Sequence, residues 1–218
     1  MPGEKEAVGL RVIGGRFRGS KLQYAGDNRV RPMKDRTREA VFNLISTASK
    51  GKHVIDLFAG TGALAIEALS RGAVSATLIE KHLATMRNLR MNIESLALAD
   101  FCRLIQADAF YMARHPAELQ VPTHLPWQVF CSPPYDFYVE KQTEMLEMLQ
   151  LLYENAPEES VFVIESDNRF DFGLLQLAEE NDLRRRSYPP AEIGVYQKCR
   201  VQNAEFKVGS EITLNFAF

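Results

Sequence analysis

A carboxylate beside a glycine-rich turn is the feature of this sequence best suited to chemistry. Asp56 ends a short apolar run that begins at His53, and Gly60 and Gly62 follow it closely. Because glycine lacks a Cβ atom, backbone N–H groups in such a turn can approach a ligand, and a helix starting there presents the positive end of its dipole. A carboxylate buried at this place must be compensated, which favours a ligand bearing an ammonium group. We therefore expect a small-molecule site at this turn.

The glycine spacing leaves two cofactor classes open. Gly60, Gly62 and Ala65 satisfy the dinucleotide fingerprint, and Glu80 follows at roughly the expected distance of about 20 residues. A dinucleotide fold usually keeps an apolar residue at the position of Asp56, whereas D-x-F-x-G-x-G resembles the first motif of the S-adenosylmethionine-dependent methyltransferases. The sequence favours a methyltransferase over a nicotinamide-dependent oxidoreductase, and both over a tight turn without a ligand.

These residues need a fold that brings the ends of several strands together. Apolar, β-branched runs alternate with stretches of helical periodicity, which is typical of an open α/β sheet with parallel strands. Parallel strands end at one edge of such a sheet, so Glu80 is expected beside the glycine turn. Asp108, in the loop after the third strand, suits a helix N-cap. The predicted strands cover 53–56, 75–80 and 160–166, the third strand and its exit fall within 102–110, the fourth strand and the loop after it fall within 127–135, and a closing antiparallel hairpin covers 183–198. The predicted helices cover 63–71, 82–98 and 137–153. A further helix is expected with Asp35 or Thr37 as its N-cap and Gly51 as its stop, and a surface loop is expected over 115–126.

Length and composition indicate an ordinary globular chain with one main domain. Its 218 residues are 46% hydrophobic and 25% charged, which suits one core with a small appendage. Three widely spaced cysteines offer neither a disulfide framework nor a CxxC zinc site, so we expect no metal and a reducing compartment. Residues 1–10 lack the apolar core of a secretory signal, and no run of about 18 apolar residues suits a membrane span. These features predict a cytoplasmic protein without membrane contacts, and we expect a monomer.

A basic N-terminal region stands against an acidic remainder. Nine Lys and Arg but only Asp27 and Asp35 fall within residues 11–38, although the whole chain has a net charge of −2. Glycines and alternating apolar and basic residues over 11–23 predict a small β-hairpin or curled ribbon that must dock on the main domain or on a partner. A basic face on an acidic body is typical of a protein that binds a polyanion, with a plain solvated surface as the alternative. The arginines expected to contact phosphates are Arg11, Arg16, Arg18, Arg31, Arg36 and Arg38.

Several ordered motifs resemble one methyltransferase family. The matching runs are Arg11 to Gly15, Arg18 to Leu22, Arg31 to Asn43, Asp56 to Leu64 and Glu67 to Ala73. Together they resemble the RsmD-type family of bacterial ribosomal RNA guanine-N2 methyltransferases. The resemblance implies a Rossmann-like, seven-stranded α/β methyltransferase sheet, S-adenosylmethionine as donor, and a guanine of small-subunit (16S) rRNA, free or in the subunit, as acceptor. We expect a basic β-hairpin extension (1–34), a methyltransferase domain (35–200) and a tail that could add a strand (201–218).

The resemblance also implies roles for individual residues. In amine methyltransferases the loop after the fourth strand reads Asn or Asp, Pro, Pro, then Tyr or Phe; it holds the amine while the ring stacks on the flipped base. The predicted catalytic residues are Ser132, Pro133, Pro134 and Tyr135. Asp56 is expected to face the ammonium group of the cofactor, Glu80 its ribose, and Asp108 with the adjacent backbone N–H its adenine. The predicted cofactor-binding set is Asp56, Phe58, Gly60, Thr61, Gly62, Glu80, Lys81, Asp108 and Ala109.

Ser132 departs from the family pattern, which has Asp at this position. A hydroxyl can accept a hydrogen bond, but it is shorter and neutral, so it cannot offset the positive charge that grows on nitrogen as the methyl group arrives. Losing that charge-assisted contact is expected to cost on the order of 100-fold in rate. The sequence leaves three alternatives open: a slower or differently tuned methyltransferase, one acting on another nucleophile, or an inactive RNA-binding or ribosome-assembly protein.

Overall fold

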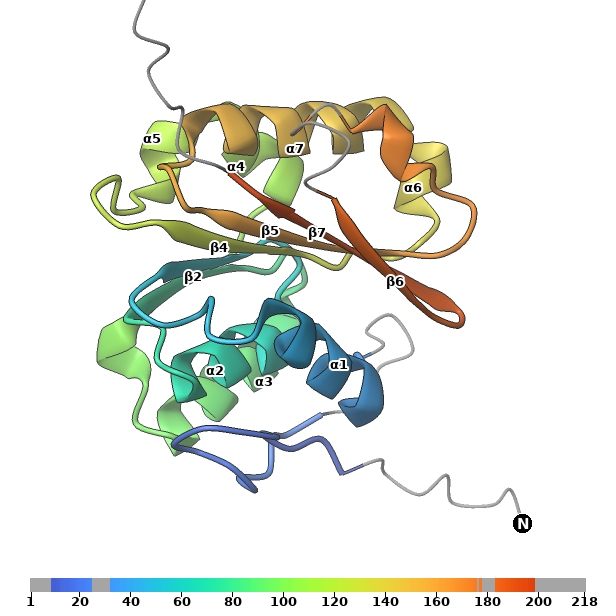
Figure 1. The fold of residues 1–218 in the computed structure, drawn as a ribbon. Coiled ribbons are helices and arrows are strands. Elements are labelled where there is room, and N and C mark those ends of the chain that lie inside the picture. The colour runs from blue at the N-terminus through green and yellow to red at the C-terminus, as the bar shows by residue number, and fades with distance from the viewer. Residues whose placement is uncertain (1–8, 25–31, 176, 178–182, 199–218) are drawn as a thin grey trace, which may run out of the picture.

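One seven-stranded sheet forms the centre of the molecule (Figure 1). The strands are β1 (His53–Asp56), β2 (Ser75–Ile79), β3 (Cys102–Ile105), β4 (Trp127–Cys131), β5 (Val161–Ser166), β6 (Arg184–Tyr188) and β7 (Ala191–Gln197). Their order across the sheet is β3, β2, β1, β4, β5, β7, β6. β1 to β5 are parallel, and β7 and β6 pair antiparallel at one edge. The predicted seven-stranded α/β sheet is therefore confirmed.

The structure is a computed structural model that describes residues 9–24, 32–175, 177 and 183–198. The expected extra strand in the tail, 201–218, lies outside these described residues. Among the described residues, no helix is long and apolar enough to cross a membrane.

Helices cover both faces of the sheet (Figure 1). One face carries α1 (Asp35–Ile45), α2 (Ala63–Ser70) and α3 (Leu83–Ser95), and the other carries α4 (Ala109–Arg114), α5 (Pro116–Leu119), α6 (Phe137–Glu140) and α7 (Gln142–Asn155). Single 3-10 turns occur at Ala99–Phe101 (η1) and Phe172–Leu174 (η2). Because side chains alternate along a strand, each face has its own apolar cluster. Val54, Phe130 and Val163 belong to the cluster with α1, α2 and α3, and Ile55 and Phe162 to the other.

Three local features differ from the sequence prediction. The helix expected over 137–153 is interrupted at Lys141, whose φ of −131° leaves the helical region and whose Nζ lies 4.6 Å from the ring centroid of Phe137. α5 forms inside the expected loop at 115–126. Lys34, rather than Asp35 or Thr37, is the N-cap residue of α1, without a side-chain capping bond. Asp35 instead lies in the first turn, where its negative charge favours the helix dipole.

The N-terminal segment, residues 9–24, folds back on itself and packs on α2. Its described part contains a single antiparallel bridge, between Arg11 and Lys21. The carboxylate of Glu67 accepts hydrogen bonds from the N–H groups of Ile13 at 2.7 Å and Gly14 at 2.8 Å. The two arms of the segment are also joined by backbone hydrogen bonds from Val12 to Ser20 at 2.9 Å and from Leu22 to Leu10 at 2.8 Å. The segment is therefore a short curled ribbon, and Glu67 binds the N–H groups at its bend to α2.

Candidate active site

Three polar side chains gather on one face of the sheet where parallel strands end. Asp56 ends β1, Ser132 directly follows β4, and Glu165 lies at the penultimate position of β5. Side-chain alternation places them on the same face as Val54, Phe130 and Val163, toward α1, α2 and α3. Cys131 pairs with Ile164 in the sheet, so the next residue along each strand, Ser132 and Glu165, also lie side by side.

The glycine turn between β1 and α2 has the backbone shape that only glycine adopts readily. Gly60 and Gly62 have φ of 53° and 79°, and a Cβ atom on Gly62 would lie 2.4 Å from Leu89 Cδ1. The N–H of Gly60 donates to Glu80 Oε2 at 3.0 Å, and the N–H of Gly62 donates to the carbonyl of Ala59 at 2.7 Å. Both donors expected to approach a ligand therefore have partners in the protein, so the glycines contribute the shape of the turn.

Asp56 is buried beside this turn with part of its hydrogen-bonding capacity unused. Asp56 is only 1% exposed. Within the described chain, no group donates a hydrogen bond to its Oδ1 atom. Burial, together with the charge of Glu80, raises the pKa of Asp56 to about 7, although hydrogen bonds from the N–H groups of Ala65 and Phe58 oppose the shift. A buried acceptor without a donor fits a site for a cationic ligand group, such as the ammonium of S-adenosylmethionine.

Glu80 directly follows β2, the neighbour of β1, and Asp108 follows β3, the next strand outward. Glu80, 7% exposed, also accepts a hydrogen bond from the N–H of His82 at 2.8 Å. Asp108 caps α4 by accepting from the N–H of Phe110 at 2.9 Å and pairs with Lys81 Nζ at 2.8 Å. Burial acts to raise the pKa of Asp108, but the hydrogen bonds from Lys81 and Phe110 outweigh it and hold the pKa below its usual value. The helix-capping interpretation of Asp108 is correct, and its second oxygen is engaged by Lys81.

The remaining residues of the predicted cofactor set lie around these carboxylates. Phe58 is half-buried and meets the ring of Phe137 edge to face at a centroid distance of 6.1 Å. Thr61 is buried in the turn, and its carbonyl accepts from Asn92 Nδ2 at 2.9 Å. Ala109 is buried at the first position of α4. The carboxylate, turn and aromatic residues thus lie at the carboxyl ends of the parallel strands.

The loop after β4 is bound to Glu165. The Ser132 hydroxyl donates a short hydrogen bond to Glu165 Oε2, and the Tyr135 hydroxyl donates to Oε1 at 2.8 Å. Pro133 between them is buried, whereas Pro134 is exposed. Sequence reasoning assigned Glu165 only to a buried strand, although the rule applied to Glu80, an acid at the end of a buried parallel strand, would have identified it.

The structure corrects the expected role of Arg38. Its side chain is completely buried and donates to the carbonyl of Met33 at 3.1 Å, to the carbonyl of Arg11 and to Asp35 Oδ1 at 2.9 Å. Burial lowers its pKa, while Asp35 and Glu67 oppose that shift. Arg38 therefore holds α1 to the N-terminal segment and is not available to a phosphate.

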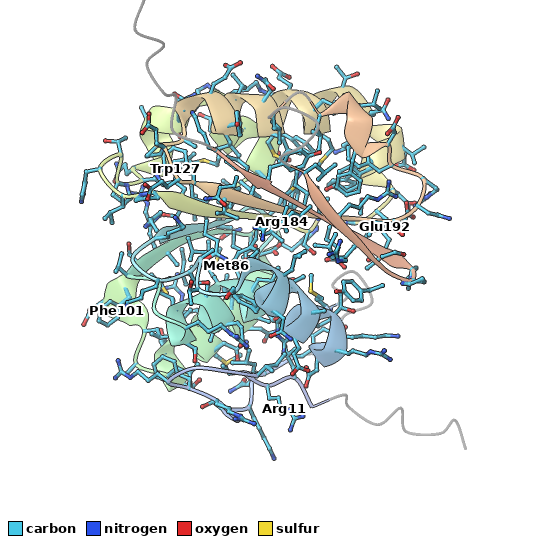
Figure 2. All side chains as sticks on the ribbon, viewed as in Figure 1. Arg11, Met86, Phe101, Trp127, Arg184 and Glu192 are labelled. Carbon is cyan, nitrogen blue, oxygen red and sulfur yellow. The ribbon has the colours of Figure 1, made fainter. Side chains whose placement is uncertain are left out.

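The other arginines predicted to contact phosphates differ in their surroundings. Arg11, Arg16, Arg18 and Arg36 are exposed, and Figure 2 shows Arg11 beyond α1 and α2, on the side away from the sheet. Arg11 also pairs with Asp35 at 3.1 Å. Arg31 lies outside the described residues. Within the described ranges no group of three His, Cys, Asp or Glu side chains is arranged to hold a metal ion.

Comparison with known proteins decides the family. A family model described as "Conserved hypothetical protein 95" matches residues 10–197. Ribosomal RNA small subunit methyltransferase D of Escherichia coli strain K12 is 33% identical over 160 residues, covering 72% of this chain and 75% of the relative. The chain belongs to this RsmD-type family. The protein of the same name from Haemophilus influenzae is 32% identical to this RsmD-type chain over 148 residues, which is 67% of this chain and 72% of that protein.

Solved structures place this RsmD-type chain in the methyltransferase fold. Escherichia coli yhhF, described as a candidate methyltransferase, has a TM-score of 0.68 at 31% identity and covers 88% of this chain and 98% of its own. An RNA methyltransferase from Salinibacter ruber in complex with S-adenosyl-L-homocysteine has a TM-score of 0.55 at 17% identity, covering 78% and 95%. The second likeness supports the fold alone.

Proposed function

We propose that this RsmD-type protein transfers a methyl group from S-adenosylmethionine to the exocyclic N2 amine of a guanine in small-subunit rRNA. The observation that carries the proposal is that buried Asp56, whose Oδ1 atom has no donor, and the Ser132 to Tyr135 loop lie at the carboxyl ends of the neighbouring strands β1 and β4. Family membership and the rRNA methyltransferase names of the relatives support an RNA substrate.

The cofactor would be held by the residues around the glycine turn. Asp56 would accept hydrogen bonds from its ammonium group, Glu80 from the ribose hydroxyls, and the backbone at Asp108 and Ala109 would meet the adenine. When bound, S-adenosylmethionine supplies a methyl group on a positively charged sulfur, which is a strong electrophile. The two carboxylates Asp56 and Glu80 also provide negative charge close to that cationic centre.

The target base would be held by the loop after β4. A guanine amine is a weak nucleophile because its lone pair is delocalised into the ring. The Ser132 hydroxyl donates its proton to Glu165, so its lone pairs are free to accept an amine hydrogen, and the carbonyl that follows would accept the second. Tyr135 would stack on the flipped base while Pro133 limits the motion of the loop. Positioning and electrostatics would supply most of the rate enhancement.

Mass spectrometry of rRNA nucleosides tests this function. Purified protein is incubated with S-adenosylmethionine and with small subunits or free rRNA from a strain that lacks the protein. We expect N2-methylguanosine to appear in the RNA, and isothermal calorimetry to show binding of S-adenosylmethionine. Cofactor binding with methylation of a different nucleoside would shift the proposal to another nucleophile. Cofactor binding with no methylation of either substrate would favour an RNA-binding or assembly protein, and stabilisation by NAD alone would favour an oxidoreductase.

Exposed arginines of the N-terminal segment should contribute to RNA affinity through phosphates. We expect Arg16→Gln with Arg18→Gln to weaken binding of small-subunit rRNA and to lower the slope of log K against log salt by about 1 to 2, because each phosphate contact releases about one counterion. Filter binding at several salt concentrations measures this. Arg114→Gln, on α4 at the opposite face of the sheet, is the control, since this residue is paired with Glu147 at 3.6 Å. Equal slopes for all three proteins would place the RNA elsewhere.

A further inference from the structure

Glu165 is a buried carboxylate to which both hydroxyls of the catalytic loop point. The residue is 7% exposed, and its two oxygens accept separately from Ser132 and Tyr135. The same loop is fixed a second time by Arg169, which pairs with Asp136 at 2.9 Å and with Asp167 at 2.8 Å. The carboxyl end of β5 and the residues after it thus hold the loop through Glu165 and Arg169. The Glu165 carboxylate lies within hydrogen-bond distance of the Ser132 hydroxyl.

We propose that Glu165 is the carboxylate of the base pocket and that it receives, through the Ser132 hydroxyl, the proton released when the amine is methylated. The inference rests on the proposed function. Ser132 is neutral and cannot by itself offset the positive charge on the amine. The negative charge that the family pattern places on an Asp of the loop is here supplied by Glu165 on the neighbouring strand β5.

The proton balance of this step is complete. As the N–C bond forms and the C–S bond breaks, the electron pair of the C–S bond stays on sulfur and the amine nitrogen gains a positive charge. The amine then gives one proton to Ser132 Oγ while Ser132 gives its own proton to Glu165 Oε2. The products are a neutral methylated amine, an unchanged serine and a protonated Glu165, which returns its proton to solvent after release.

The surroundings of Glu165 suit a proton acceptor. Burial raises the pKa of Glu165, and the hydrogen bonds from Ser132 and Tyr135 oppose that shift without cancelling it. The residue opposite it on β7 is the apolar Ile193. The titratable and charged groups around it are Tyr135 in the loop, Cys131 and Tyr138 on the β4 side, and the Arg169 pairs with Asp136 and Asp167 beyond β5. No cation contacts Glu165 among the described residues, so its charge is available to the developing cation.

Single-turnover methylation of small-subunit rRNA tests the relay. We expect Glu165→Gln and Ser132→Ala each to slow transfer by about 100-fold, the low end of general base catalysis, and the double variant to be no slower than either. Glu165→Asp should retain part of the rate. Ser132→Asp combined with Glu165→Gln moves the carboxylate into the loop, and we expect it to regain about 10-fold over Glu165→Gln alone. The wild-type rate should fall as Glu165 becomes protonated at low pH, and this limb should be absent from Glu165→Gln.

Carboxyl-carbon NMR titration of the protein without cofactor gives a second readout. We expect the pKa of Glu165 to lie above its usual value and to rise further in Ser132→Ala, because a hydrogen bond that favours the ionised form is lost. Glu192→Gln is the matched control. Glu192 accepts from the Ser187 hydroxyl at 2.6 Å in the closing hairpin (Figure 2), and sheet alternation places it on the face opposite to Glu165. The methylation rate of Glu192→Gln should equal that of the wild type.

The outcomes separate the two proposals. Wild-type methylation with an equally fast Glu165→Gln variant overturns the relay alone. Cofactor binding without transfer to any guanine overturns the proposed function, and the relay with it. If Glu165→Gln fails to fold, the Ser132→Ala variant tests the relay instead, because Ser132 is only half-buried. An unchanged methylation rate and an unchanged Glu165 pKa in this variant would overturn the relay.

Discussion

Asp56→Asn should make the ligand-free protein more stable at pH 8 and weaken its binding of S-adenosylmethionine by about 10- to 100-fold. The loss of affinity follows from removing a charge-assisted hydrogen bond worth about 1.5 to 3 kcal/mol. The gain in stability follows from the pKa of Asp56, which burial raises from 3.8 to about 7. At about 1.4 kcal/mol per unit, an ionised Asp56 costs the folded state up to about 4 kcal/mol. An unpaired buried amide N–H offsets part of this, so we expect a net gain of about 1 to 2 kcal/mol.

The sign of the pH dependence makes this prediction specific. Between the ordinary value of 3.8 and about 7, the folded protein holds a proton on Asp56 that the unfolded chain has released. The contribution of Asp56 to stability is therefore fully present below the lower value and is lost as the pH rises through the upper one. The difference in unfolding free energy between Asp56→Asn and wild type should grow in favour of the variant over this range. Urea unfolding at several pH values measures it.

Calorimetry with the cofactor completes the comparison. Asp100→Asn, an exposed acid in the turn before β3, is the control and should change neither stability nor affinity. If Asp56→Asn left cofactor affinity unchanged, Asp56 would not contact the ligand. If the stability difference did not vary with pH, Asp56 would not be buried as a titrating carboxyl.

Glu67→Gln should destabilise the fold by about 3 to 5 kcal/mol, the usual effect of removing one partner from a buried charge pair. Glu67 is completely buried on α2 and accepts from Arg71 Nε at 2.7 Å, besides the two N–H groups of the N-terminal segment. It also lies 4.0 Å from the buried guanidinium of Arg38. An amide would remove one of the two negative charges that compensate Arg38, the other being that of Asp35. It would also turn an N–H group toward the backbone N–H groups that Glu67 now accepts from.

Urea unfolding measures the loss, and limited proteolysis shows where it acts. We expect cleavage within residues 9–24 to become faster, because Glu67 binds this segment to α2. Glu39→Gln, on the exposed side of α1, should change stability by less than about 0.5 kcal/mol. Equal stability of Glu67→Gln and wild type would show that Arg38 and the segment are held by other contacts.

Strand ends and the glycine turn could be predicted from the sequence because their signals are local. β1 is a run of residues buried on both sides, the two glycines require positive φ, and Glu80 follows β2 directly. In a parallel sheet these features determine at which strand ends Asp56 and Glu80 lie, so the positions of these two residues followed from alternation and topology. The motif order was also sufficient to predict the family.

Arg38 and Glu165 show what only the tertiary structure decided. The sequence placed Arg38 in a basic helix start, which is typical of a phosphate contact, but the N-terminal segment folds over α1 and α2 and buries it against Asp35 and Glu67. Glu165 is separated from Ser132 by 33 residues, and their contact arises because β4 and β5 are neighbours in parallel register. Local patterns determine which residues are apolar, turning or charged. Which charges meet depends on long-range packing. This packing buries Arg38 in a structural role and brings the Glu165 carboxylate into contact with the neutral Ser132.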